Sequence, residues 1–566
     1  MKKLSLLFPD RDDKKYKRLS ETTVHDLGMD SIIDSLTDKK TEQVYIYNVM
    51  RLETADPDIV QYRCDVFDDI FHNKKMRDDI VDIMSRINFL KEYGSYIHDR
   101  DHDAGAFDLL HRLQEIGDYI ESIEAIYKCL TDADIHSKGL LDLKKYVTDL
   151  FEDNGFEGMK KDVAALRADT SDLKSITVGI NLNEAFEAQS IGVISLNNKP
   201  FTKSGIISNW VDKMSTKDQI HDRTDWDGSY HFEQFDAKPE GLSDNTTKAL
   251  TAMVNPFAYA SLACVPENDN STRSVTNYMN QVTNHMLHRT IKHLKDVLNK
   301  YSMLTITDIT DLMPEFIYYI RWAEYIEKLS QKGYSFARPQ CSNEAMSAEG
   351  IYNIKLAALE NHDAGHIITN DIDFSDEHRI YILTGANRGG KTTITQAVGQ
   401  LFFMAEGGIY VPASQFYFTP VDAIYTHFPA DEDKTMELGR LGEECQRFRE
   451  IYKDSTKNSL LLLNETFSTT SFEEGYYIAR DAVRAMLLKG CRVIYNTHMH
   501  KLAEDIDEMN QESKKYQAAS LVVKSDGGNR SYKVEVAPPA GMSYAKDIAE
   551  KYGVTYEMLT KEGLKK

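Results

Sequence analysis

The sequence predicts an α/β fold with a mostly parallel sheet at the C-terminus, preceded by a helical region that carries a small β-containing insert. Three short apolar runs indicate the sheet: residues 380–383 (IYIL), 460–463 (LLLL) and 493–496 (VIYN). Their lack of polar alternation is typical of parallel strands that are buried on both faces. Helical patterns separate the runs, and this alternation favours a parallel sheet covered by helices on both sides.

The first run leads into a glycine-rich loop. Gly385, four further residues and then Gly390, Lys391 and Thr392 fit the phosphate-binding pattern G-x-x-x-x-G-K-[ST]. Glycines let successive backbone N–H groups surround an anion, the lysine places a cation on the terminal phosphates, and the threonine hydroxyl can bind Mg²⁺. A glycine-rich turn without a ligand would leave Lys391 unexplained. We therefore predict a P-loop NTPase fold whose nucleotide-binding residues are Gly385, Ala386, Asn387, Arg388, Gly389, Gly390, Lys391, Thr392 and Thr393.

Polar residues follow the other two runs at their carboxyl ends, where ligands bind in such sheets. Glu465 is placed to orient or deprotonate the water that attacks a γ-phosphate, and Asn464 stands where an Asp commonly supports Mg²⁺. His498 is placed to contact the γ-phosphate or the attacking water. The alternatives for His498 are a structural histidine or a metal pair with His500, for which the sequence offers no third ligand nearby.

A glycine-bearing turn at residues 439–442 precedes another predicted helix. Taken alone, it is a turn that leads into a helix. The exposed N–H groups at such a helix start can also bind a phosphate, here one on a facing subunit.

The chain before this domain divides into helical regions around an insert. Residues 1–20 are expected to form a loose lead-in, and residues 109–130 predict a long helix because apolar side chains recur at steps of four and three. Residues 175–195 contain two β-like runs. The predicted segments are a helical region over 1–174, an insert with short strands and loops over 175–242, a second helical region over 243–340, the α/β domain over 341–555 and a short tail over 556–566.

Composition excludes several classes of protein. No stretch of the 566 residues is long and apolar enough to span a membrane, and Pro9 with charged neighbours interrupts any signal peptide. The six cysteines are scattered without metal-like pairing, which favours reduced thiols and a cytoplasmic location. With 67 basic and 89 acidic residues the net charge is −22, which argues against non-specific coating of nucleic acid.

The order of these motifs resembles the MutS family of DNA mismatch-repair ATPases, a branch of the ABC-type ATPases. The resemblance extends from residue 367 to residue 554 and is looser before that. It is carried by TGANRGGKTT (384–393), GGIYVPASQFYFTPVDAIYTHFPADED (407–433), NETFSTTS (464–471), NTH (496–498) and VEVAPPAGMSYAKDIAEKYGV (534–554).

The resemblance implies an ABC-type ATPase domain at 341–555 and a homodimer with two composite ATP sites that use Mg²⁺. Thr392 and Asn464 would hold the Mg²⁺. Glu465 would be the catalytic carboxylate and His498 the γ-phosphate sensor, acting with Lys391. The helical regions and the insert resemble the family's lever and clamp, which implies double-stranded or branched DNA between the arms. The implied trans-subunit nucleotide contacts are Gly439, Arg440 and Gly442.

The sequence departs from the family pattern at three places. Leu441 stands where a serine is usual, and Asn464 replaces an Asp, so slow turnover is expected. The Phe-x-Glu wedge of mismatch-reading members occurs only at Phe448 and Phe472, inside the ATPase region. The expected form therefore comprises lever, clamp and ATPase regions without a mismatch-recognition domain.

The charge of the insert leaves a second function open. Residues 184–240 carry six basic and ten acidic side chains, a net charge of −4, whereas a clamp that grips phosphates is expected to be basic. The alternative is a nucleotide-switched interaction protein that binds ATP but has lost DNA recognition. A small-molecule kinase would not need the long arms. The adenine pocket is poorly marked, and residues 368–370 are candidates for it.

Overall fold

The computed structural model describes most of the chain outside residues 198–311. The described residues are 4–10, 12–83, 106–152, 154–170, 175–182, 188–197, 235–236, 312–342, 346–359, 364–375, 377–385, 389–429, 439–513, 515–526, 529–539, 550 and 552–563. Contacts divide the chain into two compact units. One unit consists of residues 1–81, 130–144 and 308–566, and the other of residues 82–129 and 145–307.

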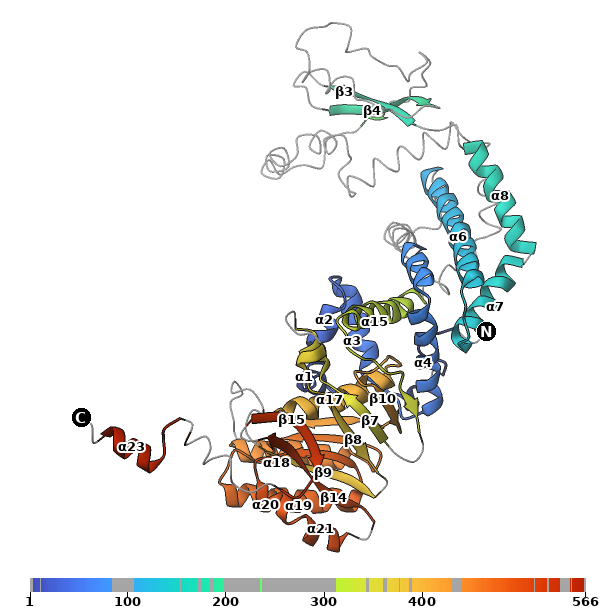
Figure 1. The fold of residues 1–566 in the computed structure, drawn as a ribbon. Coiled ribbons are helices and arrows are strands. Elements are labelled where there is room, and N and C mark those ends of the chain that lie inside the picture. The colour runs from blue at the N-terminus through green and yellow to red at the C-terminus, as the bar shows by residue number, and fades with distance from the viewer. Residues whose placement is uncertain are drawn as a thin grey trace. The chain divides into compact units, whose positions relative to one another are not determined.

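The first unit is built on a six-stranded sheet (Figure 1). Its strands, in spatial order, are β11 (Ile424–His427), β12 (Leu460–Asn464), β13 (Arg492–Asn496), β9 (His378–Thr384), β14 (Gln517–Asp526) and β15 (Asn529–Val536). The first five pair in parallel, and β15 pairs antiparallel to β14. The three apolar runs of the sequence are thus neighbouring strands of a mostly parallel sheet, as predicted.

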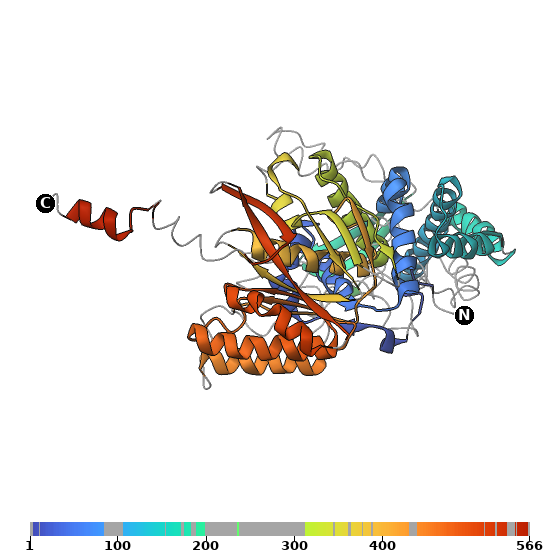
Figure 2. The same cartoon turned by 60° about the horizontal axis from the view of Figure 1, so that its bottom comes forward.

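Helices cover both faces of this sheet because its strands are apolar on both sides. One face packs against α18 (Arg440–Asp454), α19 (Phe472–Lys489), α20 (His500–Glu504) and α21 (Ile506–Glu512), and Figure 2 shows α18 and α19 as the orange layer below the sheet. The other face packs against α17 (Lys391–Glu406). A Cβ on Gly399 would lie 2.6 Å from Leu462 Cδ1 and 2.3 Å from Leu27 Cδ2, so only glycine allows α17 to sit this close to both neighbours.

A second, four-stranded sheet lies in the same unit and was not predicted. Its order is β6 (Gln340–Cys341), β10 (Gln415–Phe418), β7 (Met346–Ile351) and β8 (Asn370–Phe374). Strand β8 alternates buried and exposed residues, as expected of a strand with one face in a core. Asn370, its first residue, is brought close to the end of the glycine-rich loop. Shorter elements nearby are α16 (Ile354–Ala357) and the 3₁₀ turn η2 (Ala364–His366), and α23 (Tyr556–Gly563) is the last described helix of the chain.

Helices from the first and third segments of this unit pack together beside these sheets. They are α1 (Glu21–Asp26), α2 (Met29–Ser35), α3 (Lys40–Met50), α4 (Pro57–His72) and α15 (Met313–Gln331), with the two-stranded ribbon of β1 (Lys17–Arg18) and β2 (Leu52–Glu53) and the turn η1 (Asp13–Lys15). The described parts of the two predicted helical regions, 1–174 and 243–340, do contain helices. No helix among the described residues is long and apolar enough to cross a membrane.

The prediction of a loose lead-in over residues 1–20 is wrong for its described part. Leu6 and Leu7 are fully buried. The carboxylate of Glu315 in α15 accepts hydrogen bonds from the backbone N–H of both leucines, at 3.0 Å for Leu7, and from the Ser5 hydroxyl at 2.9 Å. Burial of two consecutive leucines stabilises the fold by removing their apolar surface from water, although most of their neighbours in the sequence are charged. Glu315 accepts hydrogen bonds from the backbone N–H groups that are buried with them.

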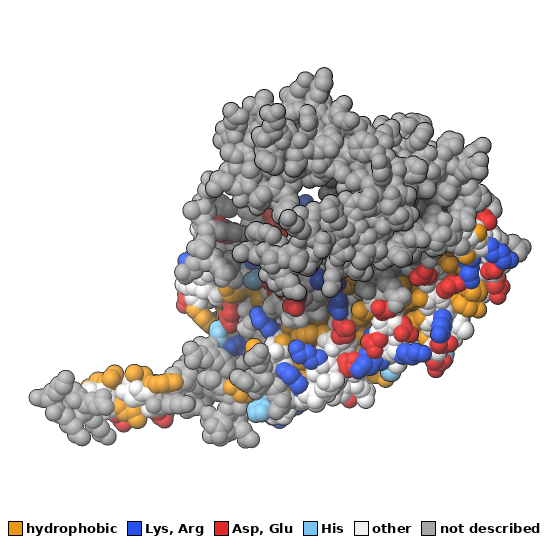
Figure 3. Space-filling view, turned by 90° about the horizontal axis from the view of Figure 1, so that it is seen from above, with side chains coloured by type: hydrophobic (Ala, Val, Ile, Leu, Met, Phe, Trp, Pro, Cys, Tyr) orange, Lys and Arg blue, Asp and Glu red, His pale blue; other side chains and the backbone are white. Residues whose placement is uncertain are grey.

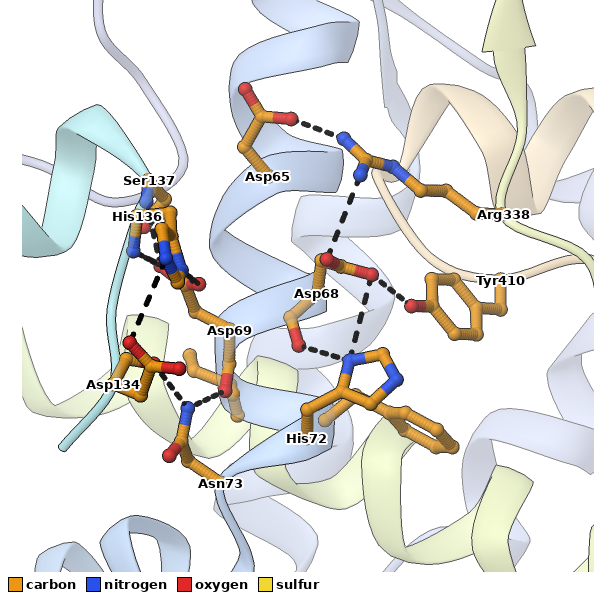
Figure 4. A network of polar contacts seen from close by, with 12 residues as sticks. Asp65, Asp68, Asp69, His72, Asn73, Asp134, His136, Ser137, Arg338 and Tyr410 are labelled. Atoms are coloured by element: carbon orange, nitrogen blue, oxygen red, sulfur yellow. Dashed lines mark hydrogen bonds and ion pairs between the residues drawn. The ribbon is translucent and has the colours of Figure 1, made fainter.

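A polar network on α4 fixes the start of α7 (Lys138–Glu152) (Figure 4). The buried carboxylate of Asp69 accepts the N–H of His136 at 2.9 Å and of Ser137 at 2.7 Å, just before that helix begins. On the other side of α4, Asp68 contacts the Tyr410 hydroxyl and lies 3.6 Å from the Arg338 guanidinium. One helix therefore holds both α7 and the segment that follows α17.

The second unit contains helices and a small antiparallel sheet. Its elements are α6 (Ala106–Asp132), which continues into the first unit, α8 (Asn154–Thr170), β3 (Ser175–Leu182), β4 (Ala188–Asn197) and β5 (Phe235–Asp236). The long helix and the two β-like runs predicted from the sequence are confirmed. The part of the second predicted helical region over residues 243–311 lies outside the described residues, as do most of the loops predicted in the insert. The five segment boundaries stay predictions.

Candidate functional site

Strand register places the predicted site residues at one edge of the main sheet. Asn464 on β12 pairs with Asn496 on β13, and Asn496 pairs with Leu383 on β9. Because these three strands are parallel, the residues that follow them emerge side by side, and this is the edge at which such sheets bind ligands. Three segments far apart in the sequence, which contain Lys391, Glu465 and His498, therefore meet.

The glycine-rich loop ends at the first turn of α17. Gly390 caps this helix with a φ of 89°, a left-handed conformation that favours glycine. Lys391 is the first helical residue; it is buried, and its Nζ donates a hydrogen bond to the Gly385 carbonyl at 3.1 Å. Burial lowers the pKa of Lys391, while the nearby Glu465 carboxylate opposes this effect. Ala386, Asn387 and Arg388 lie outside the described residues.

Three neutral side chains meet beside Lys391. The Thr392 hydroxyl donates to Asn464 Oδ1 at 3.1 Å, and the Asn496 amide lies 3.4 Å from the Thr392 hydroxyl and also contacts Asn464 Oδ1. Mg²⁺ binds hydroxyl and amide oxygens as ligands. Thr392 and Asn464 therefore fit a Mg²⁺ ion whose other ligands are water and phosphate oxygens. Among the described residues, no cluster of three or more His, Cys, Asp or Glu side chains is placed to hold a metal ion.

Glu465 and His498 face each other across this edge. His498 Nε2 lies 2.9 Å from Glu465 Oε1. Glu465 adopts a φ of 53°, which is rare for a residue with a side chain, and its N–H donates to the Asn496 carbonyl at 2.9 Å. A carboxylate held in this way can accept a proton from water, and the imidazole can donate to a phosphate oxygen.

One pocket of about 850 Å³ unites these groups. This volume is large enough for a nucleotide. Lys391, Thr392, Glu465 and His498 line one part of it. The other part is lined by residues that sequence reasoning mostly missed, including Tyr352, Leu356, His366, Ile367, Ile368, Asn370 and Tyr532.

Of the adenine candidates at 368–370, Ile368 and Asn370 line this pocket, and Thr369 lines a smaller neighbouring cavity of about 180 Å³. Asn370 also holds Tyr532 in place. Its amide donates to the Tyr532 carbonyl at 3.1 Å and accepts the Val534 N–H at 2.8 Å. Tyr532 has a φ of 56°, and its ring edge lies 3.3 Å from where a Cβ on Gly390 would stand. No sequence signal marks Tyr532, because it reaches the pocket through a tertiary hydrogen bond.

The turn at residues 439–442 begins α18, with Gly439 as its N-cap at a φ of 72°. Gly439 and Arg440 are exposed, and Gly439, Arg440 and Gly442 are not among the residues that line the pocket. Their predicted contact with the nucleotide of a second subunit stays a prediction.

Two family models match separate parts of the chain. The model described as MutS domain V matches residues 381–562, and the model described as the MutS2 N-terminal domain matches residues 55–332. The first contains every described residue assigned above to the phosphate end of the pocket.

Curated relatives agree with these matches. The chain is 28% identical over 222 residues to the DNA mismatch repair protein MutS of Thermotoga sp. (strain RQ2), which covers 37% of this chain and 27% of that protein. It is 27% identical over 192 residues to endonuclease MutS2 of Thermus thermophilus, covering 34% of this chain and 25% of the relative. It is also 27% identical over 225 residues to DNA mismatch repair protein MutS 2 of Halobacterium salinarum, covering 37% and 25%. The chain thus matches about a quarter of the length of each relative. Since two models of the MutS family match successive parts of the chain and these relatives are MutS and MutS2 proteins, the chain belongs to the MutS family.

Proposed function

We propose that this chain binds and hydrolyses ATP, and that a homodimer of it acts as a nucleotide-driven clamp on double-stranded or branched DNA. The observation that carries the proposal is the convergence of Lys391, Thr392, Glu465 and His498 on one pocket of nucleotide size. A P-loop lysine without a positioned carboxylate would support binding alone.

Each residue takes a part in the proposed reaction that its position allows. The N–H groups at the start of α17 and the Lys391 ammonium bind the β- and γ-phosphates. Glu465 orients the attacking water and accepts its proton, and His498 reports the presence of the γ-phosphate. Thr392 and Asn464 would hold a Mg²⁺ ion, which would neutralise charge on the phosphates. Because Asn464 contributes an oxygen without a charge, we propose that turnover is slow.

The remaining residues that line the pocket support ATP as the nucleotide. Tyr352, Ile367, Ile368 and Tyr532 offer aromatic and aliphatic surface to a base, and Asn370 and His366 offer polar groups beside them. Flat apolar surface with a few polar groups is typical of base-binding pockets.

The proposal of a dimeric clamp rests on evidence from outside the nucleotide pocket. It is supported by membership of the family and by the long helices α6, α7 and α8, which precede the small sheet of β3, β4 and β5 in the chain. In this proposal residues 1–174 and 243–340 form the lever, 175–242 the clamp and 341–555 the ATPase domain, while residues 439, 440 and 442 reach the second subunit's nucleotide.

An interaction protein without DNA binding is the second candidate, and the charge distribution favours it. The insert has a net charge of −4 over residues 184–240. On the face shown in Figure 3, the described residues carry basic and acidic side chains next to one another, without a separate basic patch. Phosphate binding requires a local excess of Lys and Arg.

A gel-shift titration separates the two candidates. The full chain is mixed with homoduplex, mismatched and four-way branched DNA of equal length, with ATP, with ADP and without nucleotide, at low and moderate salt. A shift that depends on ATP and weakens with salt supports the clamp. Absence of a shift under every condition, together with measurable ATP turnover, supports the interaction protein.

A further inference from the structure

The turn after β12 holds Glu465 in a conformation that its surroundings must enforce. Glu465 has a φ of 53° and Phe467 a φ of 64°, so two of three consecutive residues with side chains are left-handed. Such residues persist only where the neighbouring structure fixes them. Thr466 lies between them, so its contacts are among those that fix this turn, beside the contacts of Glu465 with the Asn496 carbonyl and with His498.

Thr466 is buried and is held at both its carbonyl and its hydroxyl. The Tyr495 hydroxyl donates to the Thr466 carbonyl at 2.9 Å. The Thr466 hydroxyl lies 3.0 Å from His427 Nδ1 and 3.3 Å from the His427 carbonyl. His427 is the last residue of β11, where it pairs with Leu463, and it is almost fully buried.

The second nitrogen of His427 determines what the first can do. Nε2 lies 3.2 Å from the Glu444 carbonyl in α18. A carbonyl only accepts hydrogen bonds, so Nε2 carries the proton and Nδ1 is an acceptor. The Thr466 hydroxyl has one hydrogen, which it shares between Nδ1 at 3.0 Å and the His427 carbonyl at 3.3 Å. Burial, with the Arg447 guanidinium nearby, lowers the pKa of His427 to about 4, so this neutral tautomer persists at neutral pH.

Arg447 fixes the end of β11 from the same helix. Its guanidinium donates to the Phe428 carbonyl at 3.0 Å and to the Thr426 carbonyl at 3.2 Å, the residues on either side of His427. It also lies 3.3 Å from Asp26 Oδ2. His427 is therefore held through the backbone on either side of it as well as through its ring, and both sets of contacts come from α18.

We propose that His427 is a positioning residue for ATP hydrolysis: its Nδ1 orients the Thr466 hydroxyl and thereby fixes Glu465 opposite His498 and Lys391. This inference rests on the proposed ATPase function. His427 is not among the residues that line the nucleotide pocket, so it acts through Thr466 rather than on the nucleotide.

Two matched pairs of variants test the inference in the full chain. Thr466→Val removes the hydroxyl at similar volume, and Thr466→Ser keeps it. His427→Gln leaves a donor near the Nε2 position and no acceptor near Nδ1, whereas His427→Asn leaves an oxygen near the Nδ1 position. Turnover, the Kd for a fluorescent ATP analogue and the Tm are measured for each. We expect kcat to fall by about tenfold or more in Thr466→Val and His427→Gln, and to stay within about threefold of the wild type in Thr466→Ser and His427→Asn, because small displacements of a catalytic group have effects of this size.

The nucleotide Kd separates positioning from folding. Unchanged Kd and KM in Thr466→Val, with kcat lost and then restored by Thr466→Ser, supports the inference. Wild-type kcat in Thr466→Val overturns it, and so does a parallel loss of Kd, Tm and kcat that Thr466→Ser shares. Absence of turnover in the wild type overturns the proposed function and this inference with it, whereas wild-type turnover that Thr466→Val leaves unchanged overturns the inference alone.

Discussion

His498 Nε2 lies 2.9 Å from Glu465 Oε1, although the two residues follow different strands and are separated by helix α19. Both side chains line the pocket that contains Lys391. This contact fixes the orientation of both side chains. A ligand that binds the His498 imidazole therefore frees the Glu465 carboxylate to bind another group. A terminal phosphate is such a ligand, because it offers anionic oxygens to the imidazole.

Glu465→Gln is expected to lower ATP turnover by about a hundredfold or more and to leave ATP binding unchanged. The amide keeps the size of the side chain but cannot take a proton from the attacking water. Phosphate release and the Kd for a fluorescent ATP analogue measure the two effects separately. Glu473→Gln, which removes an exposed charge in the first turn of α19, is the matched control. Unchanged turnover in Glu465→Gln would remove Glu465 from the mechanism.

Asn464→Asp is expected to lower the Mg²⁺ concentration for half-maximal turnover by about tenfold and to raise turnover. A carboxylate at this position adds a charge to the oxygen that contacts Thr392, and charged ligands bind a divalent cation more strongly. A Mg²⁺ titration of phosphate release compares wild type, Asn464→Asp and Asn464→Ala. If the Mg²⁺ dependence of all three coincides, residue 464 does not serve the metal.

Tyr532→Ala is expected to weaken ATP binding by about tenfold, and Tyr532→Phe to leave it near the wild-type value. The ring lines the pocket, and stacking of an aromatic side chain on a base typically contributes ~1–3 kcal/mol. Asn370 binds only backbone atoms of this segment, so both variants keep that support. Equal affinity of Tyr532→Ala and wild type for the ATP analogue would place the base elsewhere.

The burial of neutral His427 predicts a specific loss of stability in acid. Its pKa is about 4 in the folded chain and near 6.5 when the ring is exposed. Above pH 6.5 the ring is neutral in both states and its contribution is complete. Between pH 6.5 and 4 the unfolded chain takes up a proton that the folded chain does not, so the free energy of unfolding falls by about 3 kcal/mol.

Thermal unfolding of wild type and His427→Asn at a series of pH values from 7 to 4 measures this effect. Because asparagine does not titrate, the difference in Tm between the two proteins should shrink as the pH falls. A difference that stays constant over this range would show that His427 is protonated already, or equally accessible in both states.

The main sheet could be predicted from the sequence because its determinants are local. Uniform apolar runs at 380–383, 460–463 and 493–496 mark buried parallel strands, and polar residues at their ends mark the ligand edge. Because the carboxyl ends of parallel strands share an edge of the sheet, the sequence also predicts that Lys391, Glu465 and His498 lie close together.

The features that the sequence did not predict depend on single long-range contacts. The hydrogen bond from Asn370 to the Tyr532 carbonyl holds Tyr532 at the pocket, and Glu315 binds the backbone of Leu6 and Leu7. The proposed role of His427 depends on its hydrogen bond with the Thr466 hydroxyl. None of these pairs leaves a periodic pattern, so propensity and spacing carry no information about them.

The hydrogen bonds between Glu315 and residues 5–7 have a consequence for folding during synthesis. The unit that holds the nucleotide pocket is assembled from residues 1–81, 130–144 and 308–566, so its earliest helices leave the ribosome long before their partners exist. Contacts between segments so far apart form late and slowly during folding. The apolar surface of the nascent N-terminal helices therefore stays exposed to water until α15 and α17 have been synthesised.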